Sequence, residues 1–209
     1  MTLYPFQQKI LNETADKNRV AYFLEMGLGK TFLGGEKLIQ LGKRVNLLVC
    51  QKSKIQDWIN HFKENYKIVP FDLTKPKCIE GFLSWNEKQP QYINIPYCVG
   101  VINYELAWRR KELLQLEDFT LMLDESSLIQ NSKAKQSKFI LKLKPANVIL
   151  LSGTPTAGRY ENLWTQIHLL GWDLKESTYN AQFVNWKRLE IGWGVNAKSI
   201  PVIDKDQRS

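Results

Sequence analysis

The segment from residue 25 to residue 31 has the composition of a phosphate-binding loop. It ends in Gly-Leu-Gly-Lys-Thr, directly after an apolar run at 20–24 and directly before a helical pattern. Glycines let a backbone curl until its N–H groups point at phosphate oxygens, and a following helix adds its positive dipole end. Lys30 would then contact the β and γ phosphates of a nucleotide, and Thr31 would hold Mg²⁺. The backbone positions expected around the phosphates are Gly27, Leu28 and Gly29.

A pair of carboxylates favours the same chemistry. The apolar run 119–123 ends in Asp124 and Glu125, and α/β proteins bind ligands at the carboxyl ends of their strands. Asp124 would hold Mg²⁺ through water, and Glu125 would orient or deprotonate an attacking water. Leu24 stands where the full G-x-x-x-x-G-K-[ST] pattern has its first glycine, so an ordinary glycine turn and a solvated acidic turn remain the alternatives. The two segments together predict phosphoryl transfer, with Lys30, Asp124 and Glu125 as catalytic residues.

Alternating apolar runs and helical patterns surround these segments. Short runs that are continuously rather than alternately apolar lie at residues 20–24, 45–50, 99–103, 119–123 and 148–151. Such runs are typical of parallel strands covered by helices on both faces. Apolar residues at helical spacing follow two of the runs, at Ile55, Trp58, Ile59 and Phe62 and at Leu163, Trp164, Ile167 and Leu170. The predicted fold is α/β, with a mostly parallel central sheet flanked by helices on both faces.

Other stretches give weaker signals. Residues 70–96 hold four prolines and a glycine without a clean period, which predicts an insertion or an irregular crossover. Gly34 and Gly35 lower the propensity of the helix that opens at Thr31, and close packing against the sheet would explain them. After Leu170 the pattern changes to a tail that is aromatic and basic and then polar.

Composition excludes several classes of protein. With 209 residues, 44% of them hydrophobic and 24% charged, the chain fits one globular domain with a small appendage. Three cysteines without C-x-x-C spacing and two histidines give little from which to build a disulfide framework, a zinc site or a Ser-His-Asp triad. A net charge of +8 favours polyanionic partners. No apolar run or leader pattern suggests a membrane, so we expect a cytoplasmic protein.

Several segments resemble, in order, the motifs of one family. They read Tyr-Pro-Phe-Gln at 4–7, the loop at 25–31, Leu-Leu-Val-Cys at 47–50, Val-Ile-Asn-Tyr-Glu at 101–105 and Leu-Ser-Gly-Thr-Pro at 151–155. In this order the chain resembles the first RecA-like lobe of a superfamily 2 helicase or translocase, and most closely the Swi/Snf family. The resemblance covers residues 3–171, and the ordered set is far more specific than any one motif.

This resemblance implies a function and several further site residues. Residues 1–171 would form a RecA-like motor lobe of the P-loop NTPase type that binds ATP and Mg²⁺, and Gln7 would read the adenine edge. Residues 172–209 would lead towards a second RecA-like lobe of the same polypeptide. Nucleic acid, most of all double-stranded DNA, would be contacted through Ser53, Lys54, Asn103 and Tyr104. The residues that would couple hydrolysis to movement are Ser152, Gly153 and Thr154.

Two departures from the family pattern matter. Ser126 and Ser127 follow Asp124-Glu125 where the family usually has Ala or Gly and then His, and this variant resembles phage or bacterial members, which would place the protein in a prokaryotic or phage-infected cell. The second departure is that no arginine lies in a constellation like the family's motif VI. Without that arginine finger, the chain alone is expected to bind ATP and to turn it over poorly.

Two alternative functions stay open. One is a strand-separating DNA or RNA helicase of the same superfamily, and the other is a non-catalytic nucleic-acid-binding module with a relic nucleotide site.

The roles of several surface and aromatic residues also stay open. Five lysines between 133 and 144 suit either phosphate contact or a solvated helix face. Trp58 and Trp164 are interpreted as core residues because they lie on apolar stripes. Trp172, Trp186 and Trp193 either pack the tail or cover a surface for the second lobe.

Overall fold

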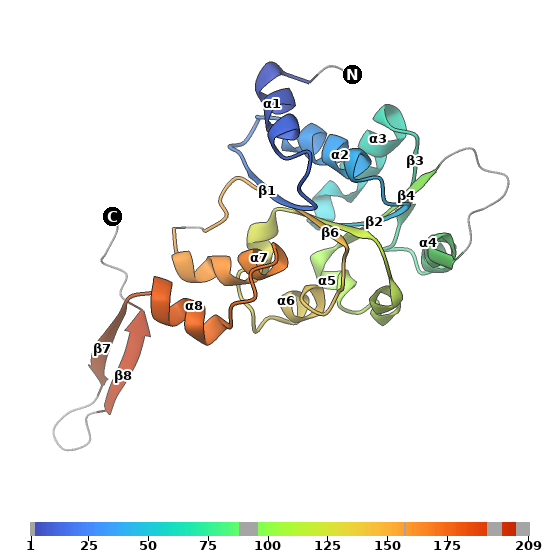
Figure 1. The fold of residues 1–209 in the computed structure, drawn as a ribbon. Helices are drawn as coiled ribbons and strands as arrows, with labels where there is room; N and C mark the ends of the chain where they lie inside the picture. Colours follow the sequence, from blue (N-terminus) through green and yellow to red (C-terminus); the bar gives the residue numbers. More distant parts are fainter. Residues whose placement is uncertain (1–2, 88–95, 157, 192–197, 204–209) are drawn as a thin grey trace.

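A six-stranded parallel sheet organises the molecule. The computed structural model describes residues 3–87, 96–156, 158–191 and 198–203. The sheet has the strand order β1-β6-β5-β2-β4-β3, and every pair in it is parallel. Its strands are β1 Arg19–Phe23, β2 Val45–Cys50, β3 Ile68–Asp72, β4 Tyr97–Asn103, β5 Thr120–Asp124 and β6 Asn147–Ser152. A separate antiparallel pair, β7 Trp186–Ile191 and β8 Lys198–Ile203, lies beyond the last helix (Figure 1).

Helices cover both faces of this sheet (Figure 1). One face carries α1 Pro5–Glu13, α2 Lys30–Leu41 and α3 Ile55–Asn65. The other face carries α4 Lys77–Glu87, α5 Tyr104–Ala107, α6 Lys135–Ile140 and α7 Trp164–Leu169, and α8 Glu176–Phe183 follows. Short 3₁₀ helices are η1 Lys52–Lys54, η2 Lys111–Gln115, η3 Ser126–Ile129 and η4 Tyr160–Leu163.

The core explains why the strand sequences are mainly apolar on both faces. Successive side chains of a strand point to opposite faces, so in β2 Leu47 packs under one helical layer and Leu48 under the other. Leu121 and Met122 divide in the same way in β5. Because both faces are buried, most positions are apolar, and a buried polar residue such as Asn46 is hydrogen-bonded to backbone carbonyls. The prediction of an α/β, RecA-like lobe with helices on both faces is confirmed.

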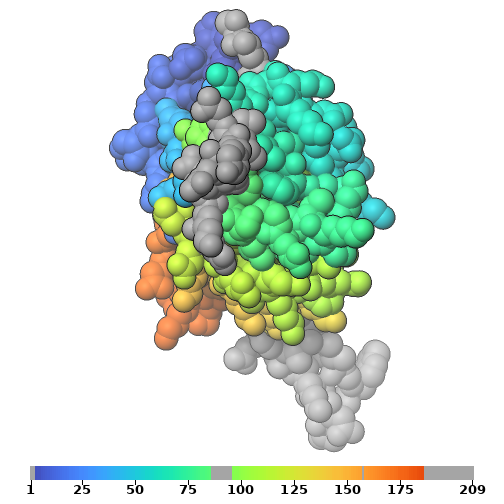
Figure 2. Space-filling model, turned by 90° about the vertical axis from the view of Figure 1, so that its right-hand side faces the viewer, coloured from blue at the N-terminus to red at the C-terminus, as the bar shows by residue number. Residues whose placement is uncertain are grey.

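The prediction of an irregular stretch at 70–96 is wrong in part. The described part of this stretch contains the end of β3 and helix α4, and the residues 88–95 lie outside the description. Pro70 argued against a strand at this position. In the sheet, however, β3 is an edge strand that pairs with β4, and proline is tolerated in an edge strand. Figure 2 views the molecule from this edge, where the green surface of α4 lies beside the blue-green surface of β3.

The tightest packing of α2 lies at its two glycines. A Cβ added at Gly34 would come 2.8 Å from Leu151 Cδ1 on the sheet, which confirms the expected close packing there. At Gly35 the neighbour is instead the Tyr66 hydroxyl, 2.6 Å away, beyond the end of α3. The two glycines therefore let α2 approach both β6 and α3.

The tail predicted from residue 172 contains ordered elements. The Tyr179 hydroxyl of α8 donates to the Tyr160 carbonyl of η4 at 2.6 Å, which attaches α8 to the rest of the lobe. Trp172, before this helix, is 58% exposed. The side chains of Trp186 and Trp193 lie outside the described ones. The division at residue 171 stays a prediction. Across the described ranges, no helix is both long and apolar enough to cross a membrane.

Candidate active site

The carboxyl ends of three neighbouring strands bring the predicted site residues together. In the sheet β6 lies between β1 and β5, with Phe23 in register with Ser152 and Leu151 in register with Asp124. The loop after β1, the carboxylates after β5 and the Ser-Gly-Thr segment after β6 therefore leave the sheet at one edge. This is the edge at which open α/β sheets bind ligands.

The loop after β1 has the conformation that its glycines predict. Gly27 has φ +83°, and Gly29, with φ +72°, is the residue that precedes α2. The Lys30 ammonium folds back and donates to the carbonyls of Leu24, at 2.8 Å, and Glu25, at 3.0 Å. A Cβ added at Gly153 would lie 3.7 Å from Lys30 Nζ, so the segment after β6 borders this lysine. The space next to Gly27 is open, because a Cβ there would meet nothing within 4 Å.

Gln7 supports this loop from α1. Its side chain is 2% exposed, its Nε2 donates to the Leu28 carbonyl at 3.0 Å, and its Oε1 accepts the Tyr4 N–H at 3.0 Å. Both ends of the amide are therefore engaged within the protein. The predicted contact of Gln7 with adenine stays a prediction, and the geometry adds a role in holding the loop.

Asp124 is a partly buried carboxylate held by an indole. Trp58 Nε1 donates to Asp124 Oδ2 at 2.8 Å, and the Tyr104 hydroxyl donates to the Asp124 carbonyl at 2.9 Å. Burial raises the pKa of the Asp124 carboxyl above its ordinary value. The Trp58 bond acts against this rise, the neighbouring Glu125 charge adds to it, and the Lys30 charge opposes it. The charges of Glu125 and Lys30 thus both act on the pKa of Asp124.

Glu125 has a backbone that few glutamates adopt. Its φ is +55°, in the left-handed region, and its Oε1 accepts hydroxyls from Ser127 and from Ser152, both at 2.6 Å. Ser152 Oγ in turn accepts the Thr154 N–H at 3.1 Å. A hydrogen-bonded chain therefore runs from the segment after β6 to Glu125. Both serine bonds use Oε1, which leaves Oε2 outside them.

A second connection lies beneath this chain. Ser126 is fully buried, and its hydroxyl donates to Gln166 Oε1 at 2.7 Å. Gln166 Nε2 then donates to the Pro155 carbonyl at 2.8 Å. Helix α7 thus links the two strand ends, and the two serines that depart from the family pattern each have a specific partner.

The predicted nucleic-acid contacts fall into two groups. Ser53 and Lys54 lie exposed in η1, where Lys54 Nζ pairs with Asp57 Oδ2 at 3.0 Å. Asn103 is 3% exposed and Tyr104 1% exposed. Both side chains are buried in this structure, and the Tyr104 hydroxyl donates to the Asp124 carbonyl. Their role as nucleic-acid contacts stays a prediction.

Sequence reasoning missed four residues that arrange the carboxylates. Trp58 was interpreted as core alone, which its burial confirms but which omits its N–H. The others are Ser126, Ser127 and Gln166. The available signals were a polar atom on a buried stripe for Trp58 and the departure from the family pattern for the two serines. The distances that join these residues are set by the fold.

The donor set suits Mg²⁺ held jointly with a nucleotide. The described residues contain no group of three or more His, Cys, Asp and Glu side chains that could hold a metal ion. Thr31, partly exposed at the start of α2, and Asp124 supply one hydroxyl and one carboxylate. Mg²⁺ commonly takes one or two protein ligands and completes its shell with phosphate oxygens and water. The residues therefore fit the ion that the sequence implied.

Comparison with known proteins finds relatives among chromatin-remodeling ATPases. The chromatin-remodeling ATPase INO80 of Saccharomyces cerevisiae (strain ATCC 204508 / S288c) is 30% identical over 179 residues, and the match covers 80% of this chain. Human INO80 is 28% identical over 196 residues, or 88% of this chain. The chain spans 12% of the length of each of these relatives.

A solved structure has the same fold. The Sulfolobus solfataricus SWI2/SNF2 ATPase core in complex with dsDNA matches with a TM-score of 0.72 at 21% identity, covering 88% of this chain and 39% of that one. None of these organisms is a bacterium or a phage, so the predicted phage or bacterial variant gains no support from them. A family model described as SNF2-related domain matches residues 22–198. The chain belongs to the family of SNF2-related domains.

Proposed function

We propose that this chain is the ATP-binding first lobe of a motor that moves on double-stranded DNA. The observation that carries the proposal is the meeting, at one sheet edge, of the Lys30 loop, the Asp124-Glu125 pair and the Ser152–Thr154 segment. Phosphate binding, water activation and a connection to a moving segment are the three parts that such a motor needs.

The loop and α2 would hold the nucleotide phosphates. Lys30 now donates to two loop carbonyls, and phosphate oxygens are stronger partners for an ammonium than neutral carbonyls are. The first N–H groups of α2 add positive potential at the same place. Thr31 and Asp124 would hold Mg²⁺, which when bound neutralises charge on the phosphate oxygens.

Glu125 would activate the attacking water. The two serine hydroxyls orient its carboxylate through Oε1, and Oε2 would accept the proton as the water oxygen attacks the γ phosphorus. The bond between that phosphorus and the bridging oxygen breaks, and ADP leaves with the electron pair. Because Ser152 also accepts the Thr154 N–H, a change at Glu125 would reach the segment after β6.

The net charge and the similarity to known proteins support DNA as the partner. The net charge is +8, INO80 is named a chromatin-remodeling ATPase, and the matching archaeal core is a complex with dsDNA. All five lysines from 133 to 144 are exposed, and none takes part in an ion pair within the described part of the chain. Lys135 Nζ lies 5.0 Å from the centre of the Trp108 ring. These lysines, and separately the exposed Ser53 and Lys54 in η1, offer contacts to phosphates that would not read sequence.

A nucleotide titration tests the proposal. A fluorescent ATP analogue with Mg²⁺ is titrated into the chain, into Lys30→Ala and into Lys63→Ala, whose exposed lysine lies on α3 away from the loop. We expect binding by the chain and by Lys63→Ala, and loss of binding in Lys30→Ala. No binding to the chain at millimolar nucleotide would favour the non-catalytic module instead.

The DNA partner is tested separately. We expect the chain to bind a labelled duplex with an affinity that falls steeply with salt, since phosphate contacts release counterions. Charge reversal at Lys135 and Lys138 together would lower that affinity and reduce the salt slope if α6 is in contact. An unchanged slope would identify these lysines as a solvated surface. Strand separation in the same assay would favour the helicase alternative.

A further inference from the structure

Trp58 has a contact that core packing does not explain. Its ring is 2% exposed, stacked on Phe62 with centroids 5.6 Å apart and edge-on to His61 at 5.6 Å. Its N–H points out of this aromatic cluster and donates to Asp124 Oδ2, 66 residues away, at 2.8 Å. A phenylalanine would fill nearly the same space without that donor. Packing therefore accounts for the ring of Trp58 but not for the hydrogen bond from its N–H to Asp124.

The aromatic cluster makes this bond directional. Rings on two sides of Trp58 restrict its rotation, so its single donor can serve only a partner in one direction. A bond from N–H to an ionised carboxylate is about twice as strong as one between neutral groups. Asp124 is also fixed through its backbone, because the Tyr104 hydroxyl holds its carbonyl. Side chain and main chain of the same aspartate are thus each held by a buried aromatic residue.

We propose that Trp58 is a positioning residue for Asp124, holding its carboxylate in the orientation that receives Mg²⁺ with the nucleotide. The inference rests on the proposed nucleotide site and adds a residue from α3 to it. Groups that hydrogen-bond a ligating carboxylate orient it, and their loss costs roughly 10- to 100-fold in metal affinity. Trp58 should therefore affect the Mg²⁺-dependent part of nucleotide binding and leave the remainder alone.

The test measures nucleotide binding with and without Mg²⁺. A fluorescent ATP analogue is titrated into the chain, Trp58→Phe and Trp85→Phe, in Mg²⁺ and in chelator. Trp85 is a matched control, since it is 3% exposed and belongs to α4, which covers the other face of the sheet. We expect the gain in affinity that Mg²⁺ provides to fall at least about tenfold in Trp58→Phe, with unchanged affinity in chelator. Trp85→Phe should keep the full gain.

A double substitution separates positioning from packing. In an Asp124→Asn background, Trp58→Phe should cause no further loss of the Mg²⁺ gain, because the two residues act through one carboxylate. An additive loss, or a full Mg²⁺ gain in Trp58→Phe alone, would overturn the inference and leave the proposed function standing. No binding by the unsubstituted chain would overturn the proposed function and the inference with it.

A measurement on the folded wild-type chain covers the case in which Trp58→Phe fails to fold. In the ¹⁵N-labelled chain, one indole N–H should exchange slowly and shift when Mg²⁺ and nucleotide are added. That indole resonance should already be displaced in Asp124→Asn and should not respond there. If every indole resonance responds alike in the two proteins, Trp58 does not act through Asp124.

Discussion

Strand β5 is bounded at both ends by a residue with a left-handed backbone, in contrasting surroundings. Asp118, two residues before the strand, has φ +47°, and Glu125, directly after it, has φ +55°. Asp118 is exposed and pairs with Lys43. Glu125 is half-buried and bonded to two serines. Aspartate tolerates the left-handed region better than glutamate does, so the strain at Glu125 needs more support from its neighbours.

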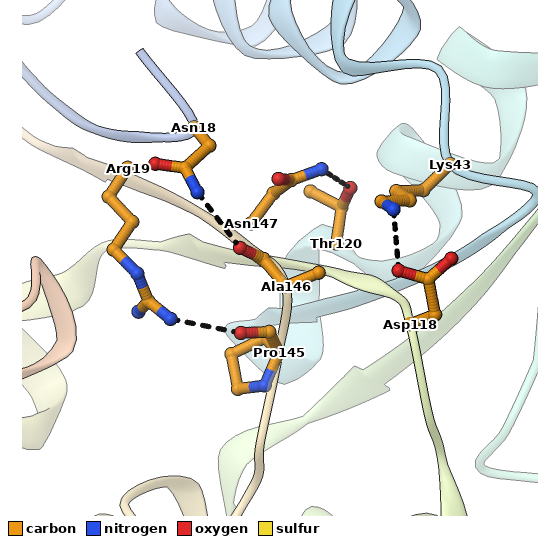
Figure 3. Close-up of polar contacts among 8 residues, drawn as sticks. All are labelled: Asn18, Arg19, Lys43, Asp118, Thr120, Pro145, Ala146 and Asn147. Atoms are coloured by element: carbon orange, nitrogen blue, oxygen red, sulfur yellow. Dashed lines mark hydrogen bonds and ion pairs between the residues drawn. The ribbon is translucent and has the colours of Figure 1, made fainter.

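The rest of the amino edge serves the fold (Figure 3). Arg19 donates to the carbonyls of Leu169, at 2.5 Å, and Pro145, at 3.0 Å, and so joins β1 to the segments around α7 and β6. Asn147 Nδ2 donates to Thr120 Oγ1 at 3.3 Å between two strands. These bonds satisfy neutral groups and gather no excess of buried negative charge.

The carboxyl edge does the opposite. Two adjacent carboxylates lie there, one with a pKa raised by burial, beside a lysine that bonds only to its own loop. Strained backbones and perturbed carboxylates persist where the surrounding structure holds them, and such places are commonly functional. The comparison indicates that substitutions at the carboxyl edge will damage function at little cost in stability, and that those at the amino edge will do the reverse.

The largest expected effect is that of Glu125→Gln on hydrolysis. Glutamine keeps an oxygen for the two serine hydroxyls but cannot take a proton from water, so phosphate release should fall about 10²- to 10⁴-fold. It is measured in single turnovers of a protein that carries this lobe together with its second RecA-like lobe, with saturating Mg²⁺-ATP and duplex DNA and with exposed Glu112→Gln as control. Nucleotide affinity should be unchanged. Equal rates in both variants would remove Glu125 as the base.

At the amino edge, Arg19→Ala should act on stability alone. It removes two bonds from a charged donor and leaves two carbonyls unpaired, so the free energy of unfolding should fall by about 2 kcal/mol. Urea unfolding measures this change. Asn18→Ala, which loses one long 3.4 Å bond at an exposed position, is the control and should change little. A loss of nucleotide affinity in Arg19→Ala would contradict the division of roles.

The sequence predicts the central strands of the sheet well for a physical reason. Where helices cover both faces, most residues are apolar, and β2 was predicted with its observed bounds. β3 lies at the edge, contains Pro70 and has partly exposed residues, so the same rule does not reach it. Helix α4 follows a short turn and carries Gly81 at a position facing Phe71, which concealed its helical period.

For the site, the sequence identifies the reacting groups but not what arranges them. Lys30, Asp124 and Glu125 follow from motif spacing, because chemistry fixes their types. Trp58 and Ser127 differ from ordinary core and loop residues only through single hydrogen bonds. Such bonds depend on how α3 and η3 pack against the sheet. Tyr104 was predicted from its motif as a nucleic-acid contact, and the fold adds a bond from its buried hydroxyl to the Asp124 carbonyl that no spacing could show.

A smaller effect should distinguish charge from packing at Asp124. Because burial raises its folded pKa, the folded protein holds a proton there more readily than the unfolded chain, and the ionised form lowers stability near neutral pH. Asp124→Asn keeps an oxygen for the Trp58 N–H and removes that charge, so its free energy of unfolding should equal or exceed that of the wild type at pH 7. The difference should shrink as pH falls towards about 4. Urea unfolding across pH tests the sign, and a less stable Asp124→Asn would contradict it.

The smallest effect is expected at the other end of the strand. Asp118→Asn removes the charge that faces Lys43 but keeps a residue type that accepts a left-handed backbone, and exposed ion pairs contribute less than about 1 kcal/mol. The free energy of unfolding should change by less than about 0.5 kcal/mol. Asp118→Ala loses the same ion pair and adds the cost of alanine at positive φ, so it should be less stable than Asp118→Asn by a measurable margin. If the two variants unfold alike, the backbone conformation at Asp118 costs nothing. The contrast with Glu125 would then rest on the buried charge and its serine partners rather than on strain.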